Sequence, residues 1–227
     1  MKFLSHLTPA RSLVRLLLAG LAVSVLGACA TRAPYDYTAF KQSRPVSMLV
    51  LPPVNESPDV KATYGVLAQA TLPLAEAGYY VLPVSLVDET FKQNGMTSPN
   101  DIHEVSYKKL HEIFGADAAV YIRVKKYGAT YMVINSETVV AVEGRIVDLR
   151  NGALLWQGSA QASSAENNNS NQGGWVGLLV NAVVKQIMST TMDASFQYAG
   201  VASQRLLGAG MPNGVLPGPR SPNYVKD

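Results

Sequence analysis

Apolar residues gather in two short runs on either side of a helix-length segment. Residues 46–51 (VSMLVL) are almost continuously apolar and stop at Pro52-Pro53, which is typical of a central strand covered on both faces. Between residues 60 and 77 the apolar positions repeat at helical spacing, and residues 79–82 form a second short run. A helix that joins two such strands normally returns the chain to the same sheet, so this order predicts a parallel βαβ opening.

The ends of this first helix carry their own signals. Asp59 is placed as its N-cap, and Gly78 lies just beyond its C-terminus. Pro73 lies inside the pattern and is expected to kink the helix or to split it. The apolar positions at helical spacing are Tyr64, Leu67, Ala68, Thr71, Leu74 and Ala75.

Two further helices precede a region in which apolar and polar residues alternate. We expect helices near residues 86–93 and over residues 98–114, which end at Asn94-Gly95 and at Gly115. Residues 120–124 then alternate strictly, and this pattern indicates a strand with one buried face.

Three antiparallel strands are predicted from this point onward. Asn151-Gly152 is a strong hairpin signal between the second and the third of them. In the second strand the apolar parity changes at Gly144-Arg145, which predicts a β-bulge or a sharp bend there. The apolar side of the third strand is formed by Leu154, Trp156, Gly158, Ala160 and Ala162.

The last part of the chain is a loop, a helix and a tail. Residues 163–174 are polar and end in glycine, and residues 208–227 are rich in proline and glycine. Between them we expect a helix over residues 175–207, with an interruption around 189–193. The pattern predicts one α/β (α+β) domain over residues 45–207. It has a mixed sheet, a βαβ opening, an antiparallel three-stranded meander and a long C-terminal helix, followed by a flexible tail over 208–227.

The first 28 residues have a different character. A positively charged start with Lys2, Arg11 and Arg15 leads into an apolar run over residues 16–26. The sequence Leu-Gly-Ala-Cys then ends at Cys29, as in the lipobox of bacterial lipoproteins. About eleven apolar residues are too few to span a bilayer, which needs roughly twenty. We therefore predict a cleaved signal over 1–28, lipid attachment at Cys29 and a tether over 29–44, in preference to an uncleaved anchor.

Removal of this leader changes the charge and the available chemistry. Three of the 19 Lys and Arg residues leave with it, so 16 basic residues balance 16 acidic ones. No basic cluster with interleaved aromatic residues points to nucleic acid. Cys29 is the only cysteine, so its acylation leaves no thiol for a disulfide or a zinc site. We expect no cofactor or metal apart from the acyl chains. In bacterial lipoproteins an Asp directly after the acylated cysteine favours retention in the inner membrane. This chain has Ala30 there, so it resembles lipoproteins of the outer membrane, and we expect it on the periplasmic face.

Several residues invite a catalytic or metal-binding interpretation without the spacing that it needs. His103 and His111 are eight positions apart on the predicted helix and about 80° apart around it, whereas metal-binding helices place histidines four apart. We expect His103 at the edge of the core and His111 in solvent. Ser57 lacks a Gly-x-Ser-x-Gly elbow, Asp88-Glu89 point about 100° apart, and Gly173-Gly174 lack the residues of a phosphate loop. The sequence predicts no enzyme and no catalytic residue.

The segment over residues 174–188 is apolar around most of a helix circumference. Three interpretations remain open: a core helix, a core helix whose second face meets another subunit, and a helix that dips into the membrane. The second predicts a homodimer whose self-association surface contains Trp175, Val176, Leu178 and Leu179.

Two motifs carry a resemblance to known families. VSMLVLPPVNES (46–57) and GADAAVYIRVKKY (115–127) resemble the core shared by the curli-secretion channel lipoprotein and the N-terminal domain of the Tol-system periplasmic protein. Over residues 45–207 the chain more closely resembles a family of bacterial outer-membrane lipoproteins of unknown function that includes a meningococcal surface antigen. The resemblance implies a dimer that works beside a curli-channel-like lipoprotein, and it supplies no catalytic residues.

These observations favour a non-enzymatic outer-membrane lipoprotein that self-associates and binds proteins of an envelope assembly or of a transport or secretion complex. Two alternatives stay open. One is a ligand-binding or accessory enzyme subunit acting on lipid, glycan or peptidoglycan, which a pocket with convergent polar groups would favour. The other is a surface-exposed antigen that contacts host molecules.

Overall fold

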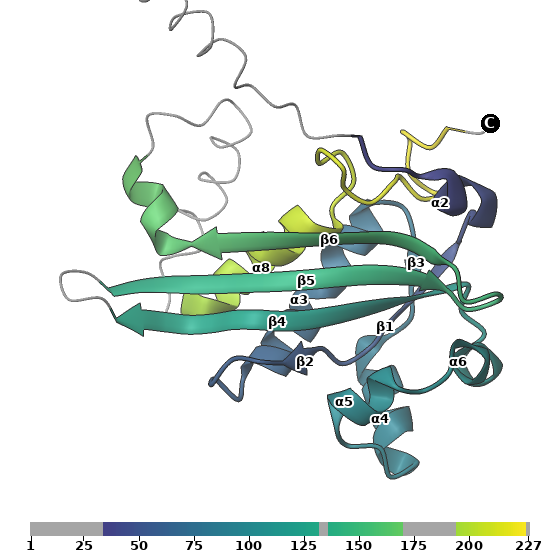
Figure 1. Cartoon of the computed structure of the whole chain (residues 1–227), viewed down its shortest axis with the longest axis horizontal. Helices are drawn as coiled ribbons and strands as arrows, with labels where there is room; N and C mark the ends of the chain where they lie inside the picture. The colour runs from purple at the N-terminus through teal and green to yellow at the C-terminus, as the bar shows by residue number, and fades with distance from the viewer. Residues whose placement is uncertain (1–33, 132–135, 170–193, 226–227) are drawn as a thin grey trace, which may run out of the picture. The chain divides into compact units, whose positions relative to one another are not determined.

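The computed structural model describes residues 34–131, 136–169 and 194–225 (Figure 1). The described residues from Asp36 onward form one compact unit. Within the described ranges no helix is long and apolar enough to cross a membrane. The elements in chain order are α2 (Thr38–Ser43), β1 (Ser47–Val50), β2 (Val54–Asn55), α3 (Ala62–Glu76), β3 (Tyr80–Val81), α4 (Val84–Gln93), α5 (Pro99–His103), α6 (Tyr107–Phe114), β4 (Ala118–Tyr131), β5 (Ser136–Asp148), β6 (Leu154–Ser163), the 3-10 helix η1 (Ser164–Asn169) and α8 (Ala194–Leu207).

The six described strands form one mixed sheet in the order β3-β1-β4-β5-β6, and β2 pairs with β4 further along. β1 lies parallel to both β3 and β4, and α3 lies between β1 and β3 in the chain. β4, β5 and β6 pair antiparallel as a meander. The α/β class, the parallel opening, the meander and the C-terminal helix are thus confirmed.

The core lies on both faces of the sheet, which explains the continuous apolar run of β1. Met48, Leu49 and Val50 are all fully buried. One face packs against α3 and α8, which lie behind the sheet in Figure 1. A cluster that includes Leu49, Phe91 and Leu110 fills the opposite face beneath α4, α5 and α6.

The predicted hairpin at Asn151-Gly152 is confirmed, but the predicted bulge is misplaced. Gly144 pairs regularly on both sides, and the register shifts lie at Lys125 in β4 and at Leu155 in β6. Ile146 continues the parity of the buried residues before it, so β5 has no phase change. Val147 and Leu149 have the opposite parity because the end of β5 is covered on both faces, and they pack against the cluster on the second face. Their apolar character therefore does not indicate a bulge. The shift at Leu155 leaves Leu154 45% exposed, contrary to the prediction, while Trp156 is buried as expected.

Two helix predictions also need correction. The expected helix over 98–114 is two helices, α5 and α6, because Ser106 begins a new one and its side chain accepts a hydrogen bond from the Lys109 N–H. α3 runs through Pro73, so of the two predicted effects of this proline the split is wrong. The N-cap of α3 is Lys61 and not the predicted Asp59, whose carboxylate accepts the Lys61 N–H in the turn before the helix. Gly78 lies just beyond the C-terminus as predicted, with a φ of +96°.

The C-terminal tail, predicted to be flexible, packs against the domain instead. Trp156 Nε1 donates to the Asn213 carbonyl at 2.9 Å, and the Tyr79 hydroxyl donates to the Leu216 carbonyl at 2.6 Å. The Gly218 N–H donates to Ala77 O at 2.7 Å. Composition alone missed this because proline and glycine disfavour regular structure but do not prevent specific packing.

Part of the predicted tether is also folded. Residues 38–43 form α2, and its Phe40 side chain is buried. The β5–β6 turn holds the end of this helix: Arg150 donates to the Ser43 carbonyl at 2.7 Å, and the Ser43 hydroxyl donates to buried Asp148 at 2.6 Å. The loop expected over 163–174 begins as η1, where Glu166 pairs with Arg205 of α8 at 2.7 Å.

Candidate functional site

Several residues singled out by the sequence lie outside the described part of the chain. Cys29, the predicted lipid attachment site, is one of them, and Gly173-Gly174 lie outside it as well. So does the predicted self-association surface, which consists of Trp175, Val176, Leu178 and Leu179. The candidate sites below are therefore identified from the contacts, the burial and the pocket of the described residues.

His103 and His111 lie in separate helices, and each forms a hydrogen bond with a backbone carbonyl. His103 Nε2 bonds to the Pro52 carbonyl at 3.0 Å, and its ring meets Tyr121 edge-on. Burial lowers the pKa of His103 to about 4, so the ring is neutral at neutral pH. His111 Nδ1 bonds to Ala116 O at 2.9 Å, so it is not simply solvated as predicted. Among the described residues, no group of three or more metal-ligating side chains comes together.

The polar residues after β1 hold the chain in place. The Ser57 hydroxyl donates to Asn55 Oδ1 at 2.7 Å, and the Asn55 amide donates to the Asp59 carbonyl at 2.8 Å. Glu56 reaches across to β4 and pairs with Arg123 and Lys125. The bonds of Ser57 close a turn, which accounts for this serine without a nucleophilic role.

The Gly-Ala-Asp sequence before β4 has a similar role. The Asp117 carboxylate accepts the backbone N–H groups of Val46 and Ser47, at 2.9 and 3.0 Å, and the Ser47 hydroxyl as well. Burial alone would raise the pKa of Asp117, but these hydrogen bonds outweigh it and hold that pKa below its usual range. Asp117 thus fixes the start of β1 beside β4.

The adjacent acids of α4 do not face one another. Asp88 pairs with Lys92 at 2.6 Å, and Glu89 accepts a hydrogen bond from Gln93 at 3.0 Å. Each carboxylate is engaged one turn along its own helix, which leaves no acid and base pair directed at a common substrate.

The first candidate site is the outer face of α3. Tyr64 is 51% and Leu72 59% exposed, and Ala68 and Ala75 are exposed beside them. On a helical wheel these four lie within about 80° of one another, and they form a stripe about 16 Å long. We call it the α3 stripe. Lys92 borders it, with its ammonium 5.2 Å from the centre of the Tyr64 ring.

The sequence pattern could not show which side of α3 faces inward. Tyr64, Ala68 and Ala75 belong to the predicted apolar set, yet they are exposed, whereas Leu67 and Leu74 are buried. The helix is apolar on nearly all sides, so its periodicity is weak. A helix of this kind is unusual at a protein surface, and this signal was available from the sequence.

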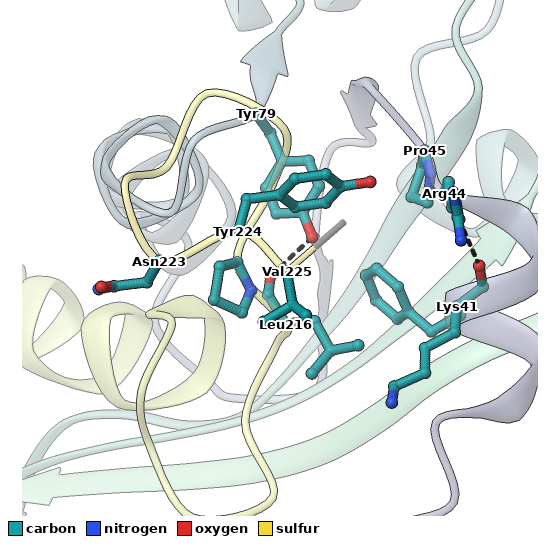
Figure 2. Close-up of a pocket in the computed structure, with 10 residues that line it drawn as sticks. Lys41, Arg44, Pro45, Tyr79, Leu216, Asn223, Tyr224 and Val225 are labelled. Carbon is teal, nitrogen blue, oxygen red and sulfur yellow. Dashed lines mark hydrogen bonds between the residues drawn. The ribbon is translucent and has the colours of Figure 1, made fainter. Parts of the chain in front are cut away.

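The second candidate site is a pocket of about 230 Å³ between α2 and the C-terminal tail, which we call the tail pocket. Figure 2 shows Lys41 and Arg44 on the side formed by α2, with Tyr79 and Tyr224 facing them. Most of the remaining lining is apolar: Phe40, Pro45, Leu216, Pro217 and Val225. Burial raises the pKa of Tyr79, so its phenol stays protonated and donates to Leu216 O.

Known proteins resemble the chain in sequence. A sequence model of the family described as "Putative lipoprotein GNA1162-like" matches residues 35–220. A protein of Neisseria meningitidis serogroup B (strain MC58), named "Putative lipoprotein NMB1124/NMB1162", is 51% identical over 201 residues, which cover 88% of this chain and 93% of that protein.

Two solved structures also match the chain. The crystal structure of lipoprotein GNA1162 from Neisseria meningitidis is 54% identical, with a TM-score of 0.51, and covers 64% of this chain and 100% of that one. The PelC dodecamer from Paraburkholderia phytofirmans is 16% identical, with a TM-score of 0.37, and covers 53% of this chain and 73% of that one. The second similarity is too remote to carry an argument about function.

Proposed function

Because the chain belongs to the GNA1162-like family of lipoproteins, we propose that it is a non-enzymatic lipoprotein, anchored to the outer membrane through Cys29, that acts by binding proteins. A second copy of the chain is the first partner, and other components of an envelope assembly or secretion complex are further partners. The α3 stripe is the observation that carries this proposal. A contiguous apolar patch with charged residues at its edge is typical of a binding surface.

The stripe supports self-association in combination with a second apolar surface. A stable interface covers roughly 800 Å² on each partner, which is more than four side chains supply. The segment over residues 174–188, apolar around most of its helical circumference, offers the additional area. We propose that the α3 stripe and the self-association surface with Trp175, Val176, Leu178 and Leu179 together form the interface of a homodimer, in which each copy buries the same two surfaces of the other.

Leu72→Asp and Leu178→Asp are each expected to convert the dimer to folded monomers in sedimentation velocity experiments. A buried carboxylate without a partner opposes association, whereas position 72 in the monomer is solvent-exposed and tolerates the charge. Ile113→Asp is the matched control, since Ile113 is an exposed apolar residue on α6. A wild-type monomer at micromolar concentration, or a dimer that survives both substitutions, would reject the interface.

Cys29→Ser is expected to abolish the incorporation of radiolabelled palmitate and to move the protein from the outer-membrane fraction to a soluble or unprocessed form. The thiol is the acylation site in this proposal, and acyl chains are what hold the domain at the bilayer. Unchanged labelling and fractionation would contradict the anchor. Thr31→Ser serves as the control because it leaves the thiol in place.

A second candidate function is suggested by the tail pocket. Its mostly apolar lining, with Lys41 and Arg44 on one side, favours a ligand that is both apolar and anionic. That would make the chain a ligand-binding subunit, in addition to or in place of a protein-binding one.

A further inference from the structure

The end of the domain at which the chain enters combines cations with exposed apolar side chains. α2 begins at Thr38, directly after the segment that leads from Cys29, and contributes Lys41 to the tail pocket, with Arg44 following it. Arg220 of the tail donates its N–H to Gly78 O, next to the pocket residue Tyr79, and its guanidinium lies 5.6 Å from the centre of the Tyr80 ring. We call this region the α2 end.

Exposed apolar residues gather at the same end. The Tyr80 N–H donates to Val46 O at 3.0 Å, so the exposed side chains of Tyr80 in β3 and of Val46, which directly precedes β1, belong to neighbouring segments of the sheet. Val225 is 73% exposed and lines the tail pocket with Tyr224. A rim that mixes aromatic and aliphatic side chains with Lys and Arg is the composition found where proteins meet a lipid headgroup layer.

The acidic residues at this end are mostly engaged. Asp117 binds backbone N–H groups at the start of β1, and Asp148 is buried beneath Arg150. Asp36 accepts hydrogen bonds from Thr38. Among the described acidic residues of this end, Asp36 and Glu76 at the end of α3 are exposed. Against these two carboxylates stand three exposed cations, Lys41, Arg44 and Arg220, so the described surface of this end has a small excess of positive charge.

We propose that the α2 end docks on an anionic phospholipid surface, with Lys41 and Arg44 on a lipid phosphate at the mouth of the tail pocket and Val225 at the level of the headgroups. This inference rests on the proposed anchor. Asp36 comes seven positions after Cys29 in the chain, which is a span of at most about 25 Å when fully extended. An anchor on so short a connection keeps the α2 end near the bilayer, so even weak individual contacts with lipid are effective.

The test uses the mature chain from position 29 with Cys29→Ser, so that no acyl chain contributes to binding. It is sedimented with vesicles of phosphatidylcholine alone and with vesicles that also contain phosphatidylglycerol. We expect binding only to the anionic vesicles, and weaker binding as salt is raised. The double substitution Lys41→Gln and Arg44→Gln should lower the vesicle affinity by about thirtyfold, because each cation near an anionic surface contributes about a factor of five.

A matched pair of substitutions controls for net charge. Lys61→Gln and Lys126→Gln remove an equal number of positive charges from the other end of the domain. Lys61 precedes the N-terminus of α3, whereas the C-terminus of α3 contacts the tail. Lys126 lies eight residues after the start of β4. This pair should change the affinity by less than about twofold, since distant charges are screened by salt.

The outcomes separate this inference from the anchor. Equal losses for both pairs, or no binding to anionic vesicles, would overturn the docking of the α2 end while palmitate labelling at Cys29 could still succeed. Failed labelling together with normal vesicle binding would overturn the anchor alone. Val225→Ser should weaken binding without altering the salt dependence, because it removes apolar contact and no charge.

Discussion

Gly78→Ala is expected to lower the free energy of unfolding by about 3 kcal/mol. Gly78 has a φ of +96°, a conformation that costs an L-residue about 1–2 kcal/mol. A Cβ atom there would also meet the backbone nitrogen of Ser221, so the tail would have to move away, at a further cost of about 1–3 kcal/mol. Chemical denaturation followed by tryptophan fluorescence would report both effects, because the Trp156 side chain donates a hydrogen bond to the tail at Asn213.

Gly95→Ala separates the two contributions. Gly95 follows α4 as Gly78 follows α3, and it also has a positive φ, of +78°. Nothing lies within 4 Å of where its Cβ would be. This substitution should therefore cost only the backbone term of about 1 kcal/mol. Equal losses at the two positions would show that the tail is not packed on Gly78 in solution.

Asp148→Asn is expected to lower the free energy of unfolding at pH 7 by about 3 kcal/mol, because it breaks a buried charge network. The Asp148 side chain is only 1% exposed, and its carboxylate accepts hydrogen bonds from Arg150 and Ser43. An amide has nearly the same shape, but an NH2 group replaces one of the two oxygens and cannot accept a hydrogen bond from Arg150 or Ser43. Glu112→Gln is the control: its pair with Lys109 is exposed on both sides and should contribute less than about 0.5 kcal/mol.

The same network gives the pH dependence of stability a definite sign. Burial alone would raise the pKa of Asp148, but hydrogen bonds from Arg150 and Ser43 hold it below its usual value of 3.8. A carboxyl with a lowered folded-state pKa stabilises the protein above its unfolded pKa and loses that contribution as the pH falls through the folded one. The difference in stability between wild type and Asp148→Asn should be constant above about pH 5 and shrink below about pH 4. Urea denaturation at several pH values would measure it, and a difference that grows with acid would contradict the assignment.

The candidate sites differ in how far the sequence could reveal them. The apolar surround of α3 was readable, but its exposed stripe was not, because a helix that is apolar on all sides gives no signal for the side that faces inward. The tail pocket was not predictable at all. It brings Lys41 together with Leu216 and Tyr224, which are more than 170 residues away in the chain, and no local pattern encodes such a contact.

The sequence by itself determined the features that depend on neighbouring residues: the alternation of β4, the continuous run of β1, the glycine that ends α3 and the hairpin at Asn151-Gly152. Only the tertiary structure decided the features that depend on contacts across the fold. It separated His103 from His111 at Ser106, and it packed a proline- and glycine-rich tail onto Tyr79 and Trp156. The physical reason is that backbone preference and hydrophobic period act over a few residues, whereas burial is set by whichever distant segment arrives to cover a surface.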